Sequence, residues 1–582
     1  MIMGYIKSIS SNKKHSLFNW MDYIVILILM SFFTGVSLIN FGDRFKQGHW
    51  FGDMESKTLT VTLAKPQLVQ QISLYFGLSN GVIDIQADGD NGQKYSLGRI
   101  DSSSVKVPLV FRWINVSFSP LKLSRIRVIV SKPVVELKQI AIYDKNNTYV
   151  RNLQLNSFPN DKRDFFTNFI SVKRPVVDEN QNWLTSASWD EVYYSTTAFQ
   201  LINMLPPYNT AHPPLGMLLI GVGILLFGMC PFGWRFIPLL SGILLIPLIY
   251  YFARILFNRR CAIFASLLFC LDFMHYGISK IATIESLVTF FLLLEYIFLY
   301  KYLLDVKNRK QVKLINGNLF LTSLFLGFAI ATKWSGCFSI VPLLLIISYC
   351  EICLSQNVLI KKAGKLCASL AMVLSIIIII YLASYLPQYF VSPSLNFLKF
   401  VYNIQKDILV YHLHEAFQAH LYASKWWSWT FNYRPYTIYS YSIGNNASVI
   451  TLMGNPAIWF FAIIACLIIV MMICKQIDKS KISLIFILLI FLSQYLPYAF
   501  ISRTSFIYYF YSATPFLCII IARVLDEILL SGGRLAKYTV RIYLFVVILL
   551  FLLFFPILSA TQIPVEYVKN YLMWYPNWNF IN

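Results

Sequence analysis

Acidic, basic and aromatic residues flank the long apolar stretches of this chain at several widely separated places. A carboxylate can take a proton from a hydroxyl group, and a guanidinium group stays charged and binds phosphate oxygens in pairs. Ionisable groups at membrane depth are costly and usually functional. The candidates for such chemistry are Asp190, Glu191, His212, Arg235, Lys280, Glu285, Lys333, Trp334, Trp427, Arg434 and Arg503.

The composition places these residues in a membrane protein. Of the 582 residues, 57% are hydrophobic and only 13% are charged, whereas soluble proteins average about a quarter charged residues. The apolar residues form runs long enough to cross a bilayer. The net charge of +22 could suggest nucleic acid, but basic clusters between apolar runs explain most of it as membrane topology. We therefore expect the lipid bilayer as a partner and no nucleic acid.

The basic clusters also decide which apolar runs cross the membrane. A lysine-bearing N-terminus precedes the first run, which we interpret as a permanent anchor that begins in the cytoplasm. The later basic clusters all fall inside only if the run 213–230 lies at the outer interface or dips in and returns. The C-terminus is then outside. The eleven predicted crossings are 21–40, 235–254, 261–277, 283–303, 318–333, 337–354, 365–388, 457–474, 482–500, 506–525 and 541–561.

The fold class that follows is a polytopic α-helical membrane protein with an inserted β-domain outside the membrane. Residues 56–155 alternate between apolar and polar types in short runs separated by turn residues, which predicts a jelly-roll-like β-sandwich on a looser tether of about 156–185. We expect any active site to face outward. The predicted units are 1–41 with the first crossing, 42–185 with the β-sandwich, 186–234 as a catalytic loop with interfacial helices, 235–388 with crossings two to seven, 389–456 as a large external loop, and 457–582 with the last crossings.

A series of short motifs in one order resembles the protein O-mannosyltransferase family of C-type glycosyltransferases. They are WDEVYY from Trp189, HPPLG from His212, PFGWR ending at Arg235, ATKWSG from Ala331, SKWWSW followed by RP, GNP, and RTSFIYYFYSATPF from Arg503. The resemblance covers about 186–530 and the first crossing, and it leaves the β-domain outside. It implies transfer of a sugar from a polyprenyl-phosphate carrier to a Ser or Thr hydroxyl of a translocated protein.

The resemblance also implies roles for individual residues. Asp190 corresponds to the family's catalytic aspartate and would take the proton from the acceptor hydroxyl. Glu191 would orient Asp190 or the acceptor, because successive helical residues point about 100° apart. Arg235 and Arg503 would grip the leaving phosphate. Lys280 and Lys333 would assist them, or else reach to the interface from helix ends.

The remaining candidates would position donor or acceptor, and each also has a structural interpretation. His212 could bind the acceptor or the phosphate, or cap a helix. Glu285 could pair with Lys280 or Arg235. Trp334 stands in the ATKWSG motif, and Trp427 belongs to a tryptophan cluster that suits sugar stacking or membrane anchoring. Arg434 could contact the donor or brace the external loop.

The predicted activity is therefore inverting transfer of a hexose, mannose by the resemblance, from a polyprenyl-phosphate donor to protein at the outer membrane face. The membrane would be the plasma membrane in a bacterium and the endoplasmic reticulum in a eukaryote. No residue spacing demands a metal, although a divalent cation on Asp190 and Glu191 stays open, as does a dimer. Alternatives are transfer to a lipid or envelope polymer, a lipid-linked sugar transporter, and a sugar-binding receptor.

Overall fold

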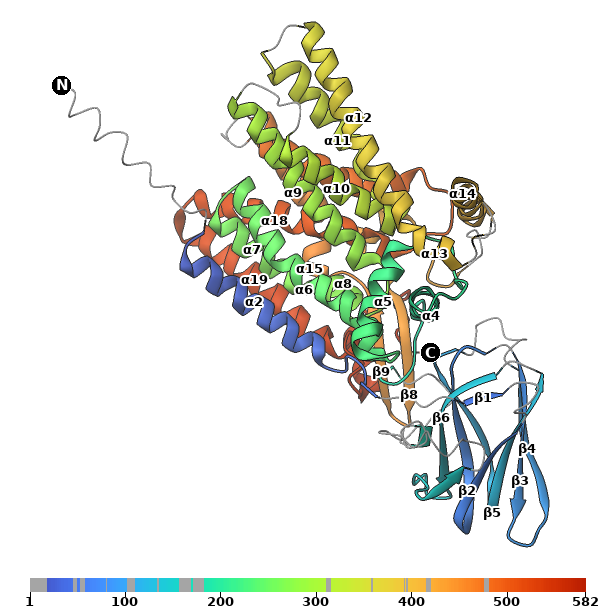
Figure 1. The fold of residues 1–582 in the computed structure, drawn as a ribbon. Helices are drawn as coiled ribbons and strands as arrows, with labels where there is room; N and C mark the ends of the chain where they lie inside the picture. Colours follow the sequence, from blue (N-terminus) through green and yellow to red (C-terminus); the bar gives the residue numbers. More distant parts are fainter. Residues whose placement is uncertain are drawn as a thin grey trace, which may run out of the picture.

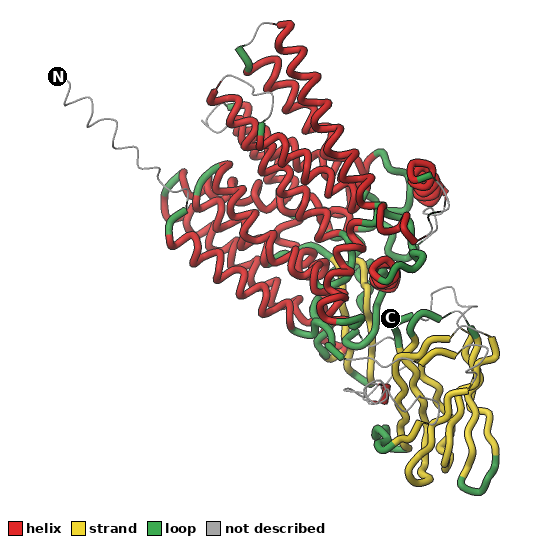
Figure 2. The backbone as a smooth tube through the Cα atoms, viewed as in Figure 1, coloured by secondary structure: helices red, strands yellow, loops and turns green. Residues whose placement is uncertain are grey.

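A bundle of long helices with a β-domain at one end makes up the chain in the computed structural model (Figures 1 and 2). The structure describes residues 18–45, 50–52, 58–79, 81–101, 110–132, 135–155, 169–170, 183–309, 316–356, 359–391, 393, 396–414, 420–475 and 481–581. The N-terminal basic segment and most of the predicted tether at 156–185 lie outside these residues.

Eight helices or helix runs of the described residues are long and apolar enough to cross a membrane. They are Trp20–Leu38, Pro231–Leu256, Glu285–Asn308, Trp334–Leu354, Ile360–Val391, Pro456–Cys474, Lys481–Ala499 and Gly533–Ile557. A ninth span results if α7 (Arg259–Cys270) and α8 (Phe273–Ser279), which meet at 61°, count as one. This confirms a polytopic helical membrane protein.

The two other predicted crossings are helical but do not meet the same criterion. The helix α10 (Gly317–Thr332) is short, and α18 (Thr514–Leu530) carries Arg523, Asp526 and Glu527 near its end. The run 213–230 forms only the short apolar helix α5 (Leu215–Phe227). The count of eleven crossings therefore stays a prediction.

Polar side chains fix where several of these helices begin. Asn19 and Asp22 form a reciprocal capping box at the start of α2 (Trp20–Leu38). The Asn258 side chain accepts from the backbone of Cys261 at the start of α7, and Asp272 does the same for α8. The Asp272 cap thus marks the bend between α7 and α8.

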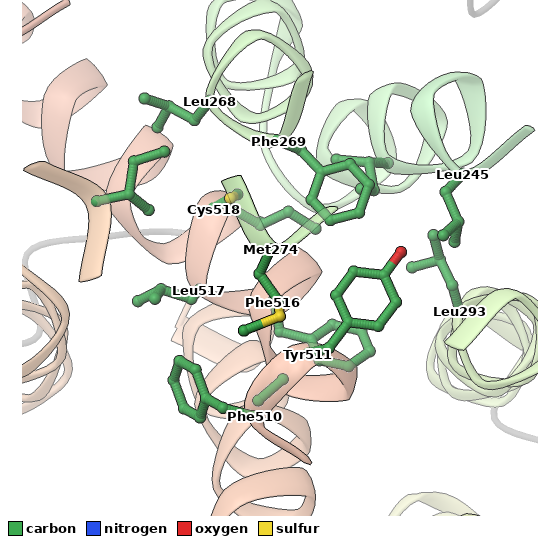
Figure 3. Close-up of a cluster of buried hydrophobic side chains, with 14 of the residues drawn as sticks. Leu245, Leu268, Phe269, Met274, Leu293, Phe510, Tyr511, Phe516, Leu517 and Cys518 are labelled. Atoms are coloured by element: carbon green, nitrogen blue, oxygen red, sulfur yellow. The ribbon is translucent and has the colours of Figure 1, made fainter. Parts of the chain in front are cut away.

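The core of the bundle is one continuous apolar cluster (Figure 3). Leu245 of α6 (Pro231–Leu256) and Leu293 of α9 (Glu285–Arg309) face Phe269 of α7 and Met274 of α8. Phe516 and its neighbours in α18 close the cluster from the other side. These contacts hold α6, α7, α9 and α18 around a common centre, from which the site elements extend.

The predicted β-domain is present as an antiparallel seven-stranded sheet, curled around its own apolar core. Its long strands β2 (Thr58–Phe76) and β5 (Trp113–Lys132) pair along most of their length. The other strands are β1 (Trp50–Gly52), β3 (Val82–Gly89), β4 (Lys94–Asp101), β6 (Val135–Asp144) and β7 (Leu153–Leu155). The spatial order is β1-β6-β2-β5-β3-β4, with β7 beside β2. The jelly-roll assignment remains a prediction.

The large external loop folds into a helix and a hairpin. The amphipathic helix α14 (Phe397–His414) is followed by β8 (Tyr436–Ile443) and β9 (Asn446–Leu452), which pair antiparallel. Near the C-terminus β10 (Ile563–Pro564) adds to β9. Figure 1 places α14 and this hairpin near the same end of the bundle as the β-domain.

Candidate active site

The residue before Asp190 is held firmly in an unusual conformation. Trp189 has a φ of 52°, in the left-handed region that few large residues adopt. Its indole N–H donates to the Tyr436 hydroxyl at 3.0 Å, and its ring packs edge-on against Tyr508 at 5.2 Å. Asp190 then caps α4 (Glu191–Ile202) without using its side chain for capping. The strain at Trp189 therefore fixes how the Asp190 carboxylate is presented.

The Asp190 side chain opens onto a polar cavity of about 940 Å³. The cavity draws its walls from α4, the start of α9, the end of α10, α14, β8 and the segment before α18. Its lining includes Asp190, Tyr193, Tyr194, Tyr208, His212, Glu285, Lys333, Asp407, Tyr411, His412, His420, Tyr436, Arg503, Tyr508 and Tyr509. Five sequence-predicted site residues, Asp190, His212, Glu285, Lys333 and Arg503, thus share one cavity.

Glu285 and Lys333 form an ion pair in this cavity. The Lys333 ammonium donates to Glu285 Oε1, and both side chains are buried. The same ammonium lies 5.0 Å from the centre of the Tyr509 ring. Glu285 therefore pairs with Lys333, and not with Lys280 or Arg235 as the sequence had suggested.

Burial and the nearby Glu285 charge raise the pKa of Asp190 to about 7, although Lys333 acts in the opposite direction. The Asp190 carboxylate makes no hydrogen bond or ion pair within the described residues, and only its backbone carbonyl accepts hydrogen bonds, from Tyr193 and Tyr194. A carboxyl with a pKa near 7 is balanced between its acid and base forms at neutral pH, which is where a proton acceptor works best.

Arg503 projects from the segment before α18 and has fixed partners. It donates to His412 Nδ1 at 2.5 Å and to the Tyr509 hydroxyl at 2.9 Å. Burial, followed by the Arg503 and Lys333 charges, lowers the pKa of His412 to about 4. His412 is therefore neutral at physiological pH, so its ring nitrogen can accept from the guanidinium.

A second cavity of about 900 Å³ adjoins the first and is mostly apolar. Its walls come from α10, α12 (Leu359–Ser384), α14 and the run 334–354, and include Ile378, Leu382, Leu409 and Phe500. The residues that line both cavities are His212, Lys333, His412, Arg503 and Tyr509. The cations Lys333 and Arg503 thus stand at a border between a polar and an apolar space, which suits an amphiphile with an anionic centre.

The prediction that Arg235 grips a phosphate is contradicted by its surroundings. Arg235 has no exposed surface and lines neither cavity. Its guanidinium donates twice to Glu191, each at 2.6 Å, and also to the carbonyls of Phe41 and Trp183. It lies 3.5 Å from the centre of the Trp183 ring. Arg235 therefore joins chain segments, and with no exposed surface it is not placed to bind a ligand.

Glu191 accordingly does not orient Asp190 directly. Besides Arg235, its carboxylate accepts from the backbone N–H groups of Ser188 and Ala282 at 3.1 and 3.0 Å. The two acidic neighbours point apart, as the helical spacing of about 100° predicts. With its oxygens occupied in this way, Glu191 is not placed to share a cation with Asp190.

Lys280 is likewise a structural residue. Its ammonium is buried and donates to the Ile39 carbonyl at 2.5 Å and to the Tyr276 hydroxyl at 2.9 Å. It lines neither cavity, so it is not placed to assist with a phosphate. The sequence could not separate it from Lys333, because both follow an apolar helix.

The other predicted residues divide between the apolar cavity and the loop. Trp334 lines the apolar cavity and donates to the Tyr381 hydroxyl at 2.9 Å. Arg434 donates to the Ala423 carbonyl at 3.1 Å and braces the external loop. Trp427 is 54% exposed and lines neither cavity, which fits membrane anchoring better than sugar stacking.

Sequence analysis missed several residues that line the polar cavity. Among them, His412 has the clearest role, because its ring accepts a hydrogen bond from Arg503. The only indication of His412 in the sequence is its position near the end of an amphipathic helix. Asp407, His420 and Tyr436 likewise belong to no recognisable motif. These residues reach the cavity because the external loop folds over the bundle, which the sequence alone does not reveal.

Models of two protein-family regions match adjoining parts of the chain. Residues 229–397 match "Dolichyl-phosphate-mannose-protein mannosyltransferase". Residues 397–578 match "C-terminal four TMM region of protein-O-mannosyltransferase". Together the two matches run through more than half of the chain and include Arg503, Glu285 and Lys333 of the polar cavity.

Related proteins extend the similarity toward the N-terminus. The polyprenol-phosphate-mannose–protein mannosyltransferase of Mycolicibacterium smegmatis is 25% identical over 67% of this chain and 87% of its own length. The protein of the same name from Corynebacterium glutamicum is 25% identical over 69% and 88%. The Saccharomyces cerevisiae protein O-mannosyltransferase Pmt1-Pmt2 complex bound to the sugar donor shares the fold, with a TM-score of 0.58, 14% identity, and 68% and 89% coverage.

Proposed function

Since the chain belongs to the protein O-mannosyltransferase family, we propose that it transfers mannose from a polyprenyl-phosphate carrier to Ser or Thr hydroxyls of proteins. The names of its bacterial relatives support this donor and this class of acceptor. The observation that carries the proposal is the common border of the two cavities, where Lys333 and Arg503 stand between a polar and an apolar space.

The donor has an apolar lipid chain, a charged phosphate and a polar sugar, and these three parts fit the apolar cavity, its border and the polar cavity in turn. The apolar cavity takes the first isoprene units, because its walls are aliphatic and aromatic side chains. Arg503 and Lys333 bind the phosphate, and Tyr509 and His412 hold the Arg503 guanidinium in place. The sugar then extends into the polar cavity toward Asp190.

The transfer needs one base and one anion site. The acceptor oxygen attacks the anomeric carbon and gives its proton to the Asp190 carboxylate. The bond from the anomeric carbon to the phosphate oxygen breaks, and the lipid phosphate leaves with the electron pair. Arg503 and Lys333 stabilise the charge that develops on it. Attack from the face opposite the phosphate inverts the anomeric configuration.

We further propose that this chemistry takes place on the non-cytoplasmic face. Ion pairs of Arg259 with Asp22 at 2.9 Å and of Arg260 with Asp526 at 2.7 Å lie among the basic clusters. Asp526 is near the end of α18, whereas the cavity residue Tyr509 precedes its start. The cavity and these basic residues are therefore at opposite ends of one helix, which supports an outward site by the positive-inside rule.

The test supplies purified protein with radiolabelled polyprenyl-phosphate mannose, together with a Thr-containing peptide and a lipid acceptor. We expect label in the peptide, released by an enzyme that cleaves mannose from threonine. Label found only in lipid would replace protein by lipid as the acceptor. Movement of intact donor across a vesicle membrane with no transfer would instead indicate a transporter.

A further inference from the structure

The inserted β-domain packs directly against the helix that presents Asp190. Phe111, just before β5, lies edge-on to Phe199 of α4 at 5.2 Å, and its carbonyl accepts from the Ala187 N–H at 3.4 Å. Phe111 has a φ of 52°. Tyr75 and Trp113 of the β-domain share an apolar cluster with α4 and α5. A residue with a strained backbone persists only where the surrounding packing holds it in place. The contact between Phe111 and α4 is therefore a firmly packed part of the fold.

The next residue, Arg112, is a buried cation that has no anionic partner among the residues the structure describes. It is only 7% exposed, its Nε–H is buried without a hydrogen-bond partner, and no ion pair joins it to another residue in the described part of the chain. An uncompensated buried charge is expensive, so such groups are normally paired. Nearby Lys138 shows the normal case, since it pairs with Glu136 at 2.5 Å. Arg112 is therefore placed to bind an anionic partner that the described residues do not supply.

Tyr193 connects this arginine to the polar cavity. It lies one turn after Asp190 on α4, lines the cavity and stacks on Tyr208 with ring centres 6.0 Å apart. Burial and the Asp190 charge raise the pKa of Tyr193, whereas the Arg112 charge lowers it. Tyr193 therefore lies within electrostatic range of both the proposed base and the Arg112 guanidinium.

We propose that Arg112 binds a carboxylate of the acceptor protein, an Asp or Glu a few residues from the hydroxyl residue at Asp190. This inference rests on the proposed function. The donor phosphate is not the expected partner, because α4, against which this part of the β-domain packs, lines the polar cavity and not the apolar one. An extended peptide advances about 3.3–3.6 Å per residue, so a nearby side chain can reach past Tyr193. The β-domain then completes the acceptor site.

The test compares peptides with one Thr and a single Glu or Gln placed at successive positions around it. With the full-length protein in lipid nanodiscs, we expect KM to be about tenfold lower for Glu than for Gln at one position, as one charge-assisted hydrogen bond implies. Arg112→Gln should abolish this preference and Arg112→Lys should keep part of it. The control Arg99→Gln alters an exposed arginine of β4 and should keep the full preference.

Equal KM values for Glu and Gln at every position in the wild type would overturn the inference while leaving mannosyl transfer intact. A preference that survives in Arg112→Gln would also overturn it. If Arg112→Gln fails to fold, the comparison of Glu and Gln peptides in the wild type and in Arg112→Lys still tests whether Arg112 binds the carboxylate. Transfer to neither peptide, with active donor present, would contradict the proposed function itself.

Discussion

The Glu191 carboxylate accepts two hydrogen bonds of 2.6 Å from the Arg235 guanidinium, and neither side chain is exposed. Through this pair the start of α4 is fastened to α6, and through the Phe41 carbonyl also to the segment that follows α2. The pair leaves Asp190, the residue next to Glu191, facing the polar cavity. One acidic residue thus anchors the helix while its neighbour is available for chemistry.

Breaking this pair should destabilise the protein. Glu191→Gln leaves a buried guanidinium without its counter-charge, a change that costs about 3–5 kcal/mol. We expect a much lower Tm by thermal unfolding in detergent, and partial recovery when Arg235→Met is added. Arg99→Gln on the exposed surface should leave Tm unchanged. An unchanged Tm in Glu191→Gln would show that the pair does not brace α4.

The architecture could largely be predicted from the sequence because its signals are local. Apolar runs long enough to cross a bilayer predict helices, and alternation of apolar and polar residues at 56–155 predicts strands. The candidate residues Asp190, Glu285, Lys333 and Arg503, which the sequence also indicated, lie together in one cavity. Whether short or charged helices such as α10 and α18 cross the membrane could not be predicted in this way, because their place in the membrane depends on the helices packed around them.

Burial of individual charges could not be predicted in the same way. Arg235 and Arg503 both stand beside an apolar run, and only the packing of Trp183 and Phe41 shows that Arg235 is enclosed. His412 lies in a segment without a motif, and it meets Arg503 only through the fold of the external loop. The roles of Arg235 and Arg503 thus depend on residues from distant parts of the chain that contact them in the folded protein.

Removing the Arg503 guanidinium should weaken donor binding. Arg503→Ala loses charge-assisted hydrogen bonds worth about 1.5–3 kcal/mol, so KM for the carrier should rise at least about tenfold. Arg503→Lys should restore part of the affinity, since it keeps the charge but not the paired donors. The exposed Arg534→Ala is the control. A donor KM that Arg503→Ala leaves unchanged would remove this residue from the phosphate site.

Filling the apolar cavity should impair the use of long-chain carriers more than that of short-chain ones. Leu409 of α14 lines that cavity, so Leu409→Trp should raise KM for a long-chain carrier more than for a short-chain analogue. Leu398→Trp on the same helix does not reach the cavity and should affect neither carrier. Equal effects of Leu409→Trp on both chain lengths would place the isoprene units elsewhere.

The rate of transfer should depend on pH through Asp190. Its pKa is raised to about 7, so protonation below that pH removes the base, and kcat should fall about tenfold per pH unit there and level off above it. Glu285→Gln removes one cause of the raised pKa and frees the Lys333 charge. It should therefore shift the acidic limb to lower pH. An acidic limb that stays in place would argue against Asp190 as the titrating group.

The most direct test is single-turnover transfer by Asp190→Asn preloaded with radiolabelled polyprenyl-phosphate mannose. A positioned base contributes about 10²–10⁴-fold, so we expect transfer to peptide to fall by at least that lower factor while carrier binding persists. Asp407→Asn, at another carboxylate of the same cavity, should retain transfer. If Asp190→Asn transfers mannose at nearly the wild-type rate, Asp190 is not the base.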